Sequence, residues 1–128
     1  FYSCTVPVFE QYTLAKFMAE GHFERHINRI KRIYKERRDT LINCIKSSPL
    51  SDFAVISGEG AGLHIVLKIM NGMSQNEIVA LALKAGVKIH GLTEYYSFPD
   101  SNIPENSLVI GFSGIDAEQI EKAFNLLI

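Results

Sequence analysis

One stretch near the middle of the chain constrains the fold more than any other: a glycine-rich turn that leads directly into an apolar strand. Three glycines fall at alternate positions over 58–62, and aliphatic residues dominate the segment 63–69 that follows. Glycine adopts positive φ at little cost, so such a turn can bend tightly or let a ligand come close. The glycines alone favour a plain hairpin turn without a ligand, because such turns are common. The strand is predicted to be buried on most of both faces and to lie centrally in a sheet.

The composition indicates one soluble globular domain. A chain of 128 residues is long enough to bury a core. Its net charge of −1 gives no global indication of binding to nucleic acid or to a membrane. No apolar run approaches the ~20 residues of a membrane span. Cys4 and Cys44 lie far apart in unlike surroundings, which favours a reducing, cytoplasmic location over a disulfide framework.

The order of the predicted elements indicates an α+β fold. Two helices come first, over 8–20 and 22–47, and terminating residues follow them at Gly21 and Pro49. Four short strands and two further helices come next, the strands over 53–57, 63–69, 87–90 and 108–113 and the helices over 74–85 and 116–127. Capping boxes mark the starts of both later helices. We therefore expect a small, mostly antiparallel sheet of about four strands, covered by helices on one face, after a long N-terminal helix.

The long predicted helix carries most of the basic residues. Eight of the thirteen lysines and arginines fall in it: Arg25, Arg29, Lys31, Arg32, Lys35, Arg37, Arg38 and Lys46. A basic face for phosphate or DNA is one interpretation. A solvated face, or one docked on an acidic neighbour, is favoured because the charges are spread around the helix without interleaved aromatic residues. His22 and His26 have a spacing that can bind zinc, but no third ligand stands nearby in sequence, so no metal site is expected.

No catalytic motif stands out in the sequence. Serine does not occur in the Gly-x-Ser-x-Gly pattern, and phosphate-loop and dinucleotide fingerprints are absent. The glycine turn precedes a strand rather than a helix, so no helix N-terminus is available there for phosphate. The long connection over 91–107 is typical of a binding loop because of its aromatic residues and prolines: Tyr95, Tyr96, Phe98, Pro99 and Pro104.

Several short motifs occur in an order that resembles one protein family. They are Glu10-Gln11, Gly21-x-x-x-Arg25-His26-Ile27-x-Arg29, Tyr34-x-x-Arg37-Arg38-Asp39-x-Leu41, Gly60-Ala-Gly-Leu-His64, Gly86-Val87, Tyr95-Tyr96 and Leu108-Val-Ile-Gly-Phe-Ser113. This ordered set resembles the C-terminal part of MocR/GabR-type transcriptional regulators. Such regulators join a winged helix-turn-helix DNA-binding domain to a fold-type I aminotransferase-like region that binds pyridoxal 5′-phosphate (PLP).

The resemblance implies that important parts of the protein lie outside this chain. Residues 1–128 would form one aminotransferase-like small domain, a fragment in which 1–20 is a helical segment that contacts the missing large domain. The start at Phe1, without an initiator methionine or a signal peptide, agrees with this expectation. The Schiff-base lysine for PLP belongs to the large domain, so no catalytic or cofactor-binding residue is expected here. DNA would be bound only through a missing N-terminal domain.

The resemblance also implies candidate residues for a substrate or effector pocket. Aminotransferases of this fold usually place an arginine in the last strand, where it binds the substrate carboxylate in bidentate fashion. By alignment this position is Val109, which argues against ordinary transamination unless another arginine substitutes. The other candidates lie in segments that reach the substrate mouth of such enzymes: Gly60, Gly62, Tyr95 and Tyr96.

Three functions stay open at this point. The leading hypothesis is the aminotransferase-like, effector-sensing part of a PLP-dependent DNA-binding regulator, with an amino-acid-like effector. The first alternative is the small domain of a true PLP-dependent aminotransferase, acting for instance on 2-aminoadipate or an aromatic amino acid. The second alternative is a non-enzymatic interaction module that uses the long helix and the aromatic loop. The chain alone is not expected to be an enzyme.

Apolar residues near the N-terminus predict self-association. They lie in the first helix and in the segment before it: Phe1, Tyr2, Val6, Phe9, Tyr12, Phe17 and Met18. Large exposed apolar patches favour association, and a terminal helix can be exchanged between copies. The chain is therefore expected to form a dimer or a higher oligomer.

Overall fold

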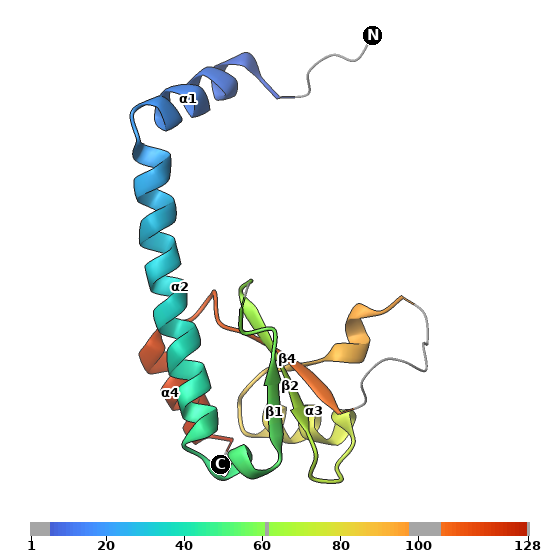
Figure 1. Ribbon diagram of the computed structural model, residues 1–128. Coiled ribbons are helices and arrows are strands. Elements are labelled where there is room, and N and C mark those ends of the chain that lie inside the picture. The colour runs from blue at the N-terminus through green and yellow to red at the C-terminus, as the bar shows by residue number, and fades with distance from the viewer. Residues whose placement is uncertain (1–5, 61, 98–105, 128) are drawn as a thin grey trace. The chain divides into compact units, whose positions relative to one another are not determined.

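A computed structural model of the chain describes residues 6–60, 62–97 and 106–127 (Figure 1). The chain divides into two compact units, Phe1–Ile33 and Tyr34–Ile128. Several residues to which predictions were attached lie outside the described ranges: Phe1, Tyr2, Phe98, Pro99 and Pro104. Within the described ranges, no helix is long and apolar enough to cross a membrane.

The first unit contains α1 (Val8–Ala19) and the first turns of α2 (His22–Lys46). Gly21 ends α1 with a φ of 73°, as the sequence predicts for a helix C-terminus. No residue of α1 is buried, and Phe9 and Tyr12 are 81% and 74% exposed. The apolar residues of α1 recur at irregular steps and are spread around the helix, so no single face collects them.

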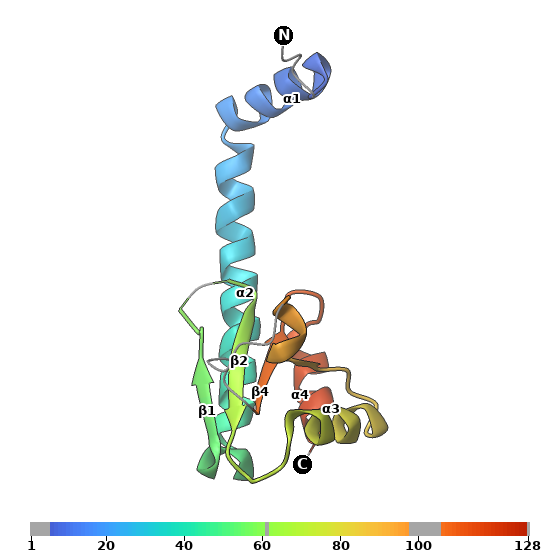
Figure 2. The same cartoon turned by 90° about the vertical axis from the view of Figure 1, so that its right-hand side faces the viewer.

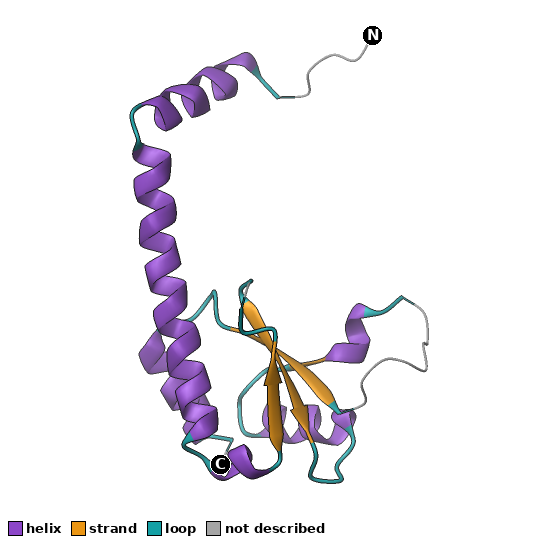
Figure 3. Ribbon diagram, in the orientation of Figure 1, coloured by secondary structure: helices purple, strands orange, loops and turns teal. Residues whose placement is uncertain are grey.

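The second unit is built on a four-stranded antiparallel sheet (Figure 3). Its strands run in the order β1-β2-β4-β3, with bounds Ala54–Ser57 for β1, His64–Ile69 for β2, Ser107–Gly111 for β4 and His90–Gly91 for β3. Figure 2 shows β2 between β1 and β4. The predicted α+β class and the interior position of the strand after the glycine turn are both confirmed.

Helices cover one face of this sheet. The core joins apolar strand residues to side chains from the last turns of α2, from α3 (Gln75–Lys84) and from α4 (Ala117–Asn125). Its buried members are Leu41, Ile45, Ile65, Leu67, Ile69, Ala82, Ile89, Leu108, Phe112, Ile120 and Phe124. Both later helices begin with the predicted capping boxes, at Ser74 and Asp116.

The prediction that the strand after the glycine turn is buried on both faces is wrong. Along β2, Ile65, Leu67 and Ile69 are buried, whereas His64 and Lys68 are exposed. Successive side chains of a strand point to opposite faces, and the helices pack on only one of them. Within the described ranges, no helix covers the second face of β2, which is called the open face below.

The predicted strand over 87–90 is also shorter than expected. Only His90 and Gly91 pair with β4. The backbone N–H of Val87 instead donates to the carbonyl of Ala82, so it closes the end of α3 and is not available to the sheet. A short 3-10 helix, η2 (Leu92–Tyr95), follows β3 directly, and another, η1 (Pro49–Asp52), precedes β1.

Candidate functional site

The open face of the sheet carries a row of four side chains that crosses all four strands. Ser57 pairs with Val66, Val66 with Val109, and Val109 with His90. Residues paired directly across antiparallel strands share a face, with Cβ atoms about 5 Å apart. The flanking residues on β2 and β4, Ile65, Leu67 and Leu108, are buried on the helical side, which places the row on the open side. The structure therefore sets the candidate Val109 between an apolar neighbour and a histidine.

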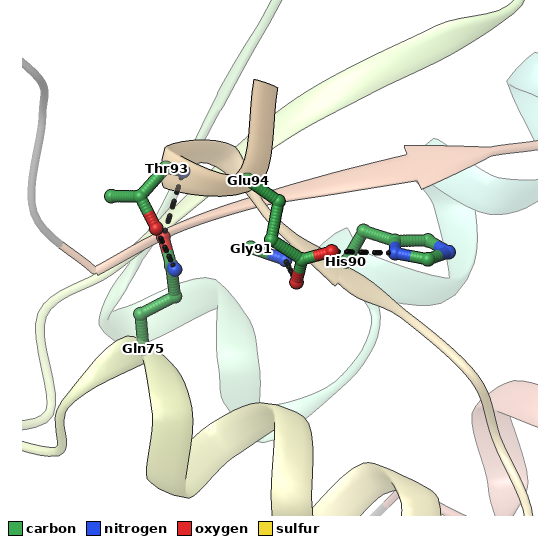
Figure 4. A network of polar contacts seen from close by, with 5 residues as sticks. All are labelled: Gln75, His90, Gly91, Thr93 and Glu94. Carbon is green, nitrogen blue, oxygen red and sulfur yellow. Dashed lines mark hydrogen bonds and ion pairs between the residues drawn. The ribbon is translucent and has the colours of Figure 1, made fainter. Parts of the chain in front are cut away.

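His90 is held by a carboxylate from the next turn of the chain. Its Nδ1 lies 2.9 Å from Oε2 of Glu94, while Oε1 of the same carboxylate accepts from the backbone N–H of Gly91 at 3.0 Å (Figure 4). The ring of Tyr95 meets the His90 ring edge-on, with centroids 6.4 Å apart. In Figure 4 the second ring nitrogen of His90 lies on the side away from Glu94. One nitrogen is thus engaged and the other faces away from the pair.

The electrostatics of the pair define which atom carries the proton. Hydrogen bonds from His90 and then from the Gly91 backbone lower the pKa of the Glu94 carboxyl below its usual range. An ionised carboxylate can only accept hydrogen bonds, so Nδ1 of His90 must be the donor. Nε2 is left either with a lone pair, in the neutral ring, or with a second proton, in the imidazolium.

A second pair of hydrogen bonds fixes the 3-10 helix that supplies Glu94. The buried side chain of Gln75 donates from Nε2 to Oγ1 of Thr93 at 2.6 Å and accepts at Oε1 from the Thr93 backbone at 3.4 Å (Figure 4). Gly91 lies directly against this amide, and a Cβ there would be 2.0 Å from Gln75 Nε2. The absence of a side chain at Gly91 lets α3 approach η2 closely enough for these bonds.

The candidates from the aromatic loop fall partly at this site. Tyr95 joins the row through His90, and its side chain is 62% exposed. Tyr96 follows it, 47% exposed, with its backbone N–H bonded to the Thr93 carbonyl at 3.3 Å. The structure thus brings Tyr95, His90 and Val109 together on one face.

The glycine candidates lie in the turn between β1 and β2. Gly62 has a φ of 84°, whereas Gly60 does not adopt positive φ. Arg38 holds this turn, because its Nη1 donates to the Glu59 carbonyl at 3.1 Å. Arg37 donates to the carbonyl of Ser113, on the segment that follows β4, at 2.5 Å. Two arginines that the sequence favoured as part of a solvated or docked face therefore fasten two loops to α2.

Sequence reasoning missed two residues of this site, His90 and Glu94. A usable signal was present, because a histidine and a glutamate four residues apart immediately precede the tyrosine pair. His90 has no second histidine at a metal-binding spacing, and no conventional sequence motif contains both His90 and Glu94. In the described ranges, no group of three or more His, Cys, Asp or Glu side chains is placed to hold a metal ion.

Relatives of known class match nearly the whole chain. No family model matches it. The HTH-type transcriptional regulators YdeL and YhdI of Bacillus subtilis are 29% and 31% identical over 126 and 116 residues, which is 98% and 91% of this chain. The probable rhizopine catabolism regulatory protein MocR of Rhizobium meliloti is 26% identical over 118 residues, 91% of the chain. The chain spans only about a quarter of the length of these relatives, 26%, 24% and 23%.

Solved structures show the same fold in aminotransferases. LysN, an alpha-aminoadipate aminotransferase of Thermus thermophilus, superposes with a TM-score of 0.77 at 18% identity, over 94% of this chain and 30% of that protein. A kynurenine aminotransferase of Pyrococcus horikoshii gives 0.72 at 22% identity, over 88% and 27%. The expected architecture, a small sheet with helices on one face, is thus a known part of larger aminotransferases.

Proposed function

Because this chain corresponds to the C-terminal aminotransferase-like part of a MocR-type transcriptional regulator, we propose that it contributes the small domain of the regulator's effector-sensing region. The parent binds PLP on a large domain, which supplies the lysine, and binds DNA through a further N-terminal domain. An amino-acid-like effector meets the open face of the sheet, where Val109 lies. Effector binding at this face then alters DNA binding elsewhere in the parent.

The observation that carries this proposal is that the row around Val109 contains no arginine. An aminotransferase needs a strong cation for the substrate carboxylate at the corresponding position, and arginine supplies it with two parallel hydrogen bonds. All five arginines of the chain fall between Arg25 and Arg38. Arg37 and Arg38 are engaged by loop carbonyls. A row without arginine favours sensing of a ligand over rapid turnover.

The first experiment measures cofactor, DNA and turnover in the complete gene product. We expect an absorbance band from bound PLP, a shift of operator DNA in a gel, and no transfer of an amino group from amino acid to 2-oxo acid. Turnover with a stoichiometry of one oxo acid per amino acid supports the first alternative, a true aminotransferase. A protein that binds neither PLP nor DNA but captures one protein partner supports the interaction module instead.

A pair of variants tests the role of Val109 itself. Val109→Arg restores a cation in the centre of the row, so we expect it to tighten binding of carboxylate-bearing amino acids or to introduce measurable transamination. Val66→Arg is the matched control, because Val66 is the neighbour of Val109 in the same row. Equal effects of the two variants would contradict a specific role for the position.

Self-association of the chain is part of the proposal. The exposed apolar side chains of α1, Phe9 and Phe17 among them, offer surface whose burial over ~600 Å² would contribute on the order of 15 kcal/mol before the costs of association. Light scattering should give the mass of a dimer or larger. A monomer mass that stays the same after Phe9→Ser and Phe17→Ser would contradict the proposal.

A further inference from the structure

The open face carries basic side chains and a carboxylate that is already engaged. His64 and Lys68 are exposed on β2, and His90 belongs to the same face through its pairing with Val109. Glu94 is the acidic group in contact with this histidine, and both of its oxygens are occupied by the His90 ring and the Gly91 backbone. Lys68 carries a positive charge on this face and the Glu94 carboxylate is already engaged, which favours an anionic ligand.

His90 has the geometry of a ligand-binding group. Its side chain is 41% exposed, so a small molecule can reach the ring, and Glu94 fixes the ring through Nδ1 at 2.9 Å. Tyr95 packs against the ring edge and restricts its rotation further. The second nitrogen, Nε2, has no hydrogen-bond partner among the described residues and lies opposite Nδ1, on the side away from Glu94 (Figure 4). A fixed imidazole with one engaged and one outward nitrogen is pre-organised, which lowers the entropy lost on binding.

We propose that His90, positioned by Glu94, binds the carboxylate of the ligand at this face, a role that an arginine at the position of Val109 would otherwise have. The proposal rests on the proposed function, because it names the ligand-binding group of the same effector site. The imidazolium donates Nε2–H to one carboxylate oxygen, and Glu94 balances the second N–H. Val66 and Val109 provide an apolar floor for the remainder of the ligand.

This arrangement makes binding depend on the protonation of His90. A carboxylate cannot donate a hydrogen bond, so it binds the imidazolium and not the neutral Nε2 lone pair. Glu94 and Tyr95 on η2 contact the ring, and Lys88 on the segment before β3 acts electrostatically on Glu94. His64 and Lys68 lie on the same face, on β2. Affinity for a carboxylate should therefore be lower when His90 is deprotonated.

The test uses sodium propionate as the probe and the complete gene product as the protein. Histidines are labelled with carbon-13 at Cε1, and the His90 resonance is assigned by its loss in His90→Gln. We expect propionate to shift this resonance saturably, and propionamide, its uncharged isostere, to leave it unmoved. The propionate Kd should rise by about tenfold in His90→Gln.

Two further variants separate binding from folding. Glu94→Gln removes the charge that balances the imidazolium, so its propionate Kd should rise while its circular dichroism spectrum stays unchanged. His26→Gln is the control, an exposed histidine on α2 rather than on the sheet, and should bind propionate as the wild type does. An unmoved His90 resonance, an equal response to propionamide, or a Kd unchanged in His90→Gln would overturn the inference.

These outcomes are distinct from a failure of the proposed function. A protein that binds PLP and DNA but whose His90 ignores propionate keeps the regulatory function and loses this inference. A protein without PLP or DNA binding loses the regulatory function, and its response to propionate then reports on the histidine alone.

Discussion

Gly91→Ala should destabilise the chain through a contact that only the tertiary structure creates. A Cβ at this position would lie 2.0 Å from Nε2, 2.3 Å from Cδ and 2.9 Å from Cγ of Gln75. These distances are too short for any packing, so the Gln75 side chain must move. Its two hydrogen bonds to Thr93, at 2.6 and 3.4 Å, are then lost.

The expected loss in the free energy of unfolding follows from those two hydrogen bonds and from a smaller effect of opposite sign on the unfolded chain. Each lost hydrogen bond costs about 1 kcal/mol, and a buried amide left without partners adds about 1 kcal/mol or more. Gly91 has φ −74° and ψ 142°, which alanine adopts without strain. Replacing glycine at such a position therefore restores about 0.4–1 kcal/mol by restricting the unfolded chain. The net loss in the free energy of unfolding should be about 2 kcal/mol.

Urea denaturation followed by circular dichroism measures this loss. At a typical slope of about 1–3 kcal/mol per molar, the midpoint should fall by about 1 M. Gly111→Ala is the matched control, since no atom lies within 4 Å of a Cβ there and its φ is not positive. A double-mutant cycle with Gln75→Ala completes the experiment, because the alanine at position 91 should cost little once the amide is absent. Equal midpoints for Gly91→Ala and Gly111→Ala, or an undiminished cost in the Gln75→Ala background, would refute the reasoning.

Three further outcomes test other contacts. Arg38→Ala should lower the free energy of unfolding by about 1–2 kcal/mol in urea titrations, because the Glu59 carbonyl loses the hydrogen bond from the half-buried guanidinium. Arg38→Lys should recover only part of this stability. Hydrogen bonds from Ser74 lower the pKa of Glu77, so this carboxylate stabilises the fold at neutral pH. The stabilisation is lost as the pH falls through the lowered pKa. When urea titrations at neutral and acid pH are compared, the free energy of unfolding should therefore fall less for Glu77→Gln than for the wild type. Burial raises the pKa of the Cys44 thiol, so iodoacetamide should modify it more slowly in the folded than in the urea-unfolded chain, as read by peptide mass mapping.

Local signals in the sequence were sufficient to predict most of the helices and strands. The helix ends at Gly21 and the capping boxes at Ser74 and Asp116 depend on neighbours within one turn, and the structure confirms them. The apolar run after the glycine turn likewise became the interior strand β2. Such features are recognisable from sequence because their hydrogen bonds join residues close together in the chain.

Burial depended on which elements the chain places against one another. The same apolar run predicted two buried faces, but the helices cover only one, so His64 and Lys68 stay exposed. The segment over 87–90 lost most of its predicted strand because Val87 closes α3 with its N–H. Periodicity reports that a side chain is apolar, whereas partners distant in sequence decide whether it is covered.

By itself the sequence determined the α+β class, the helix boundaries, the interior strand and the likeness to MocR-type regulators. Only the tertiary structure decided that Val109 faces His90 across β4 and β3, and that Glu94 fixes the histidine ring. It also gave Arg38 its role on the glycine turn, 21 residues away along the chain. The physical reason is that a binding site consists of contacts between strands whose register the hydrogen-bonded sheet sets, and register is a property of the folded pairing rather than of any single segment.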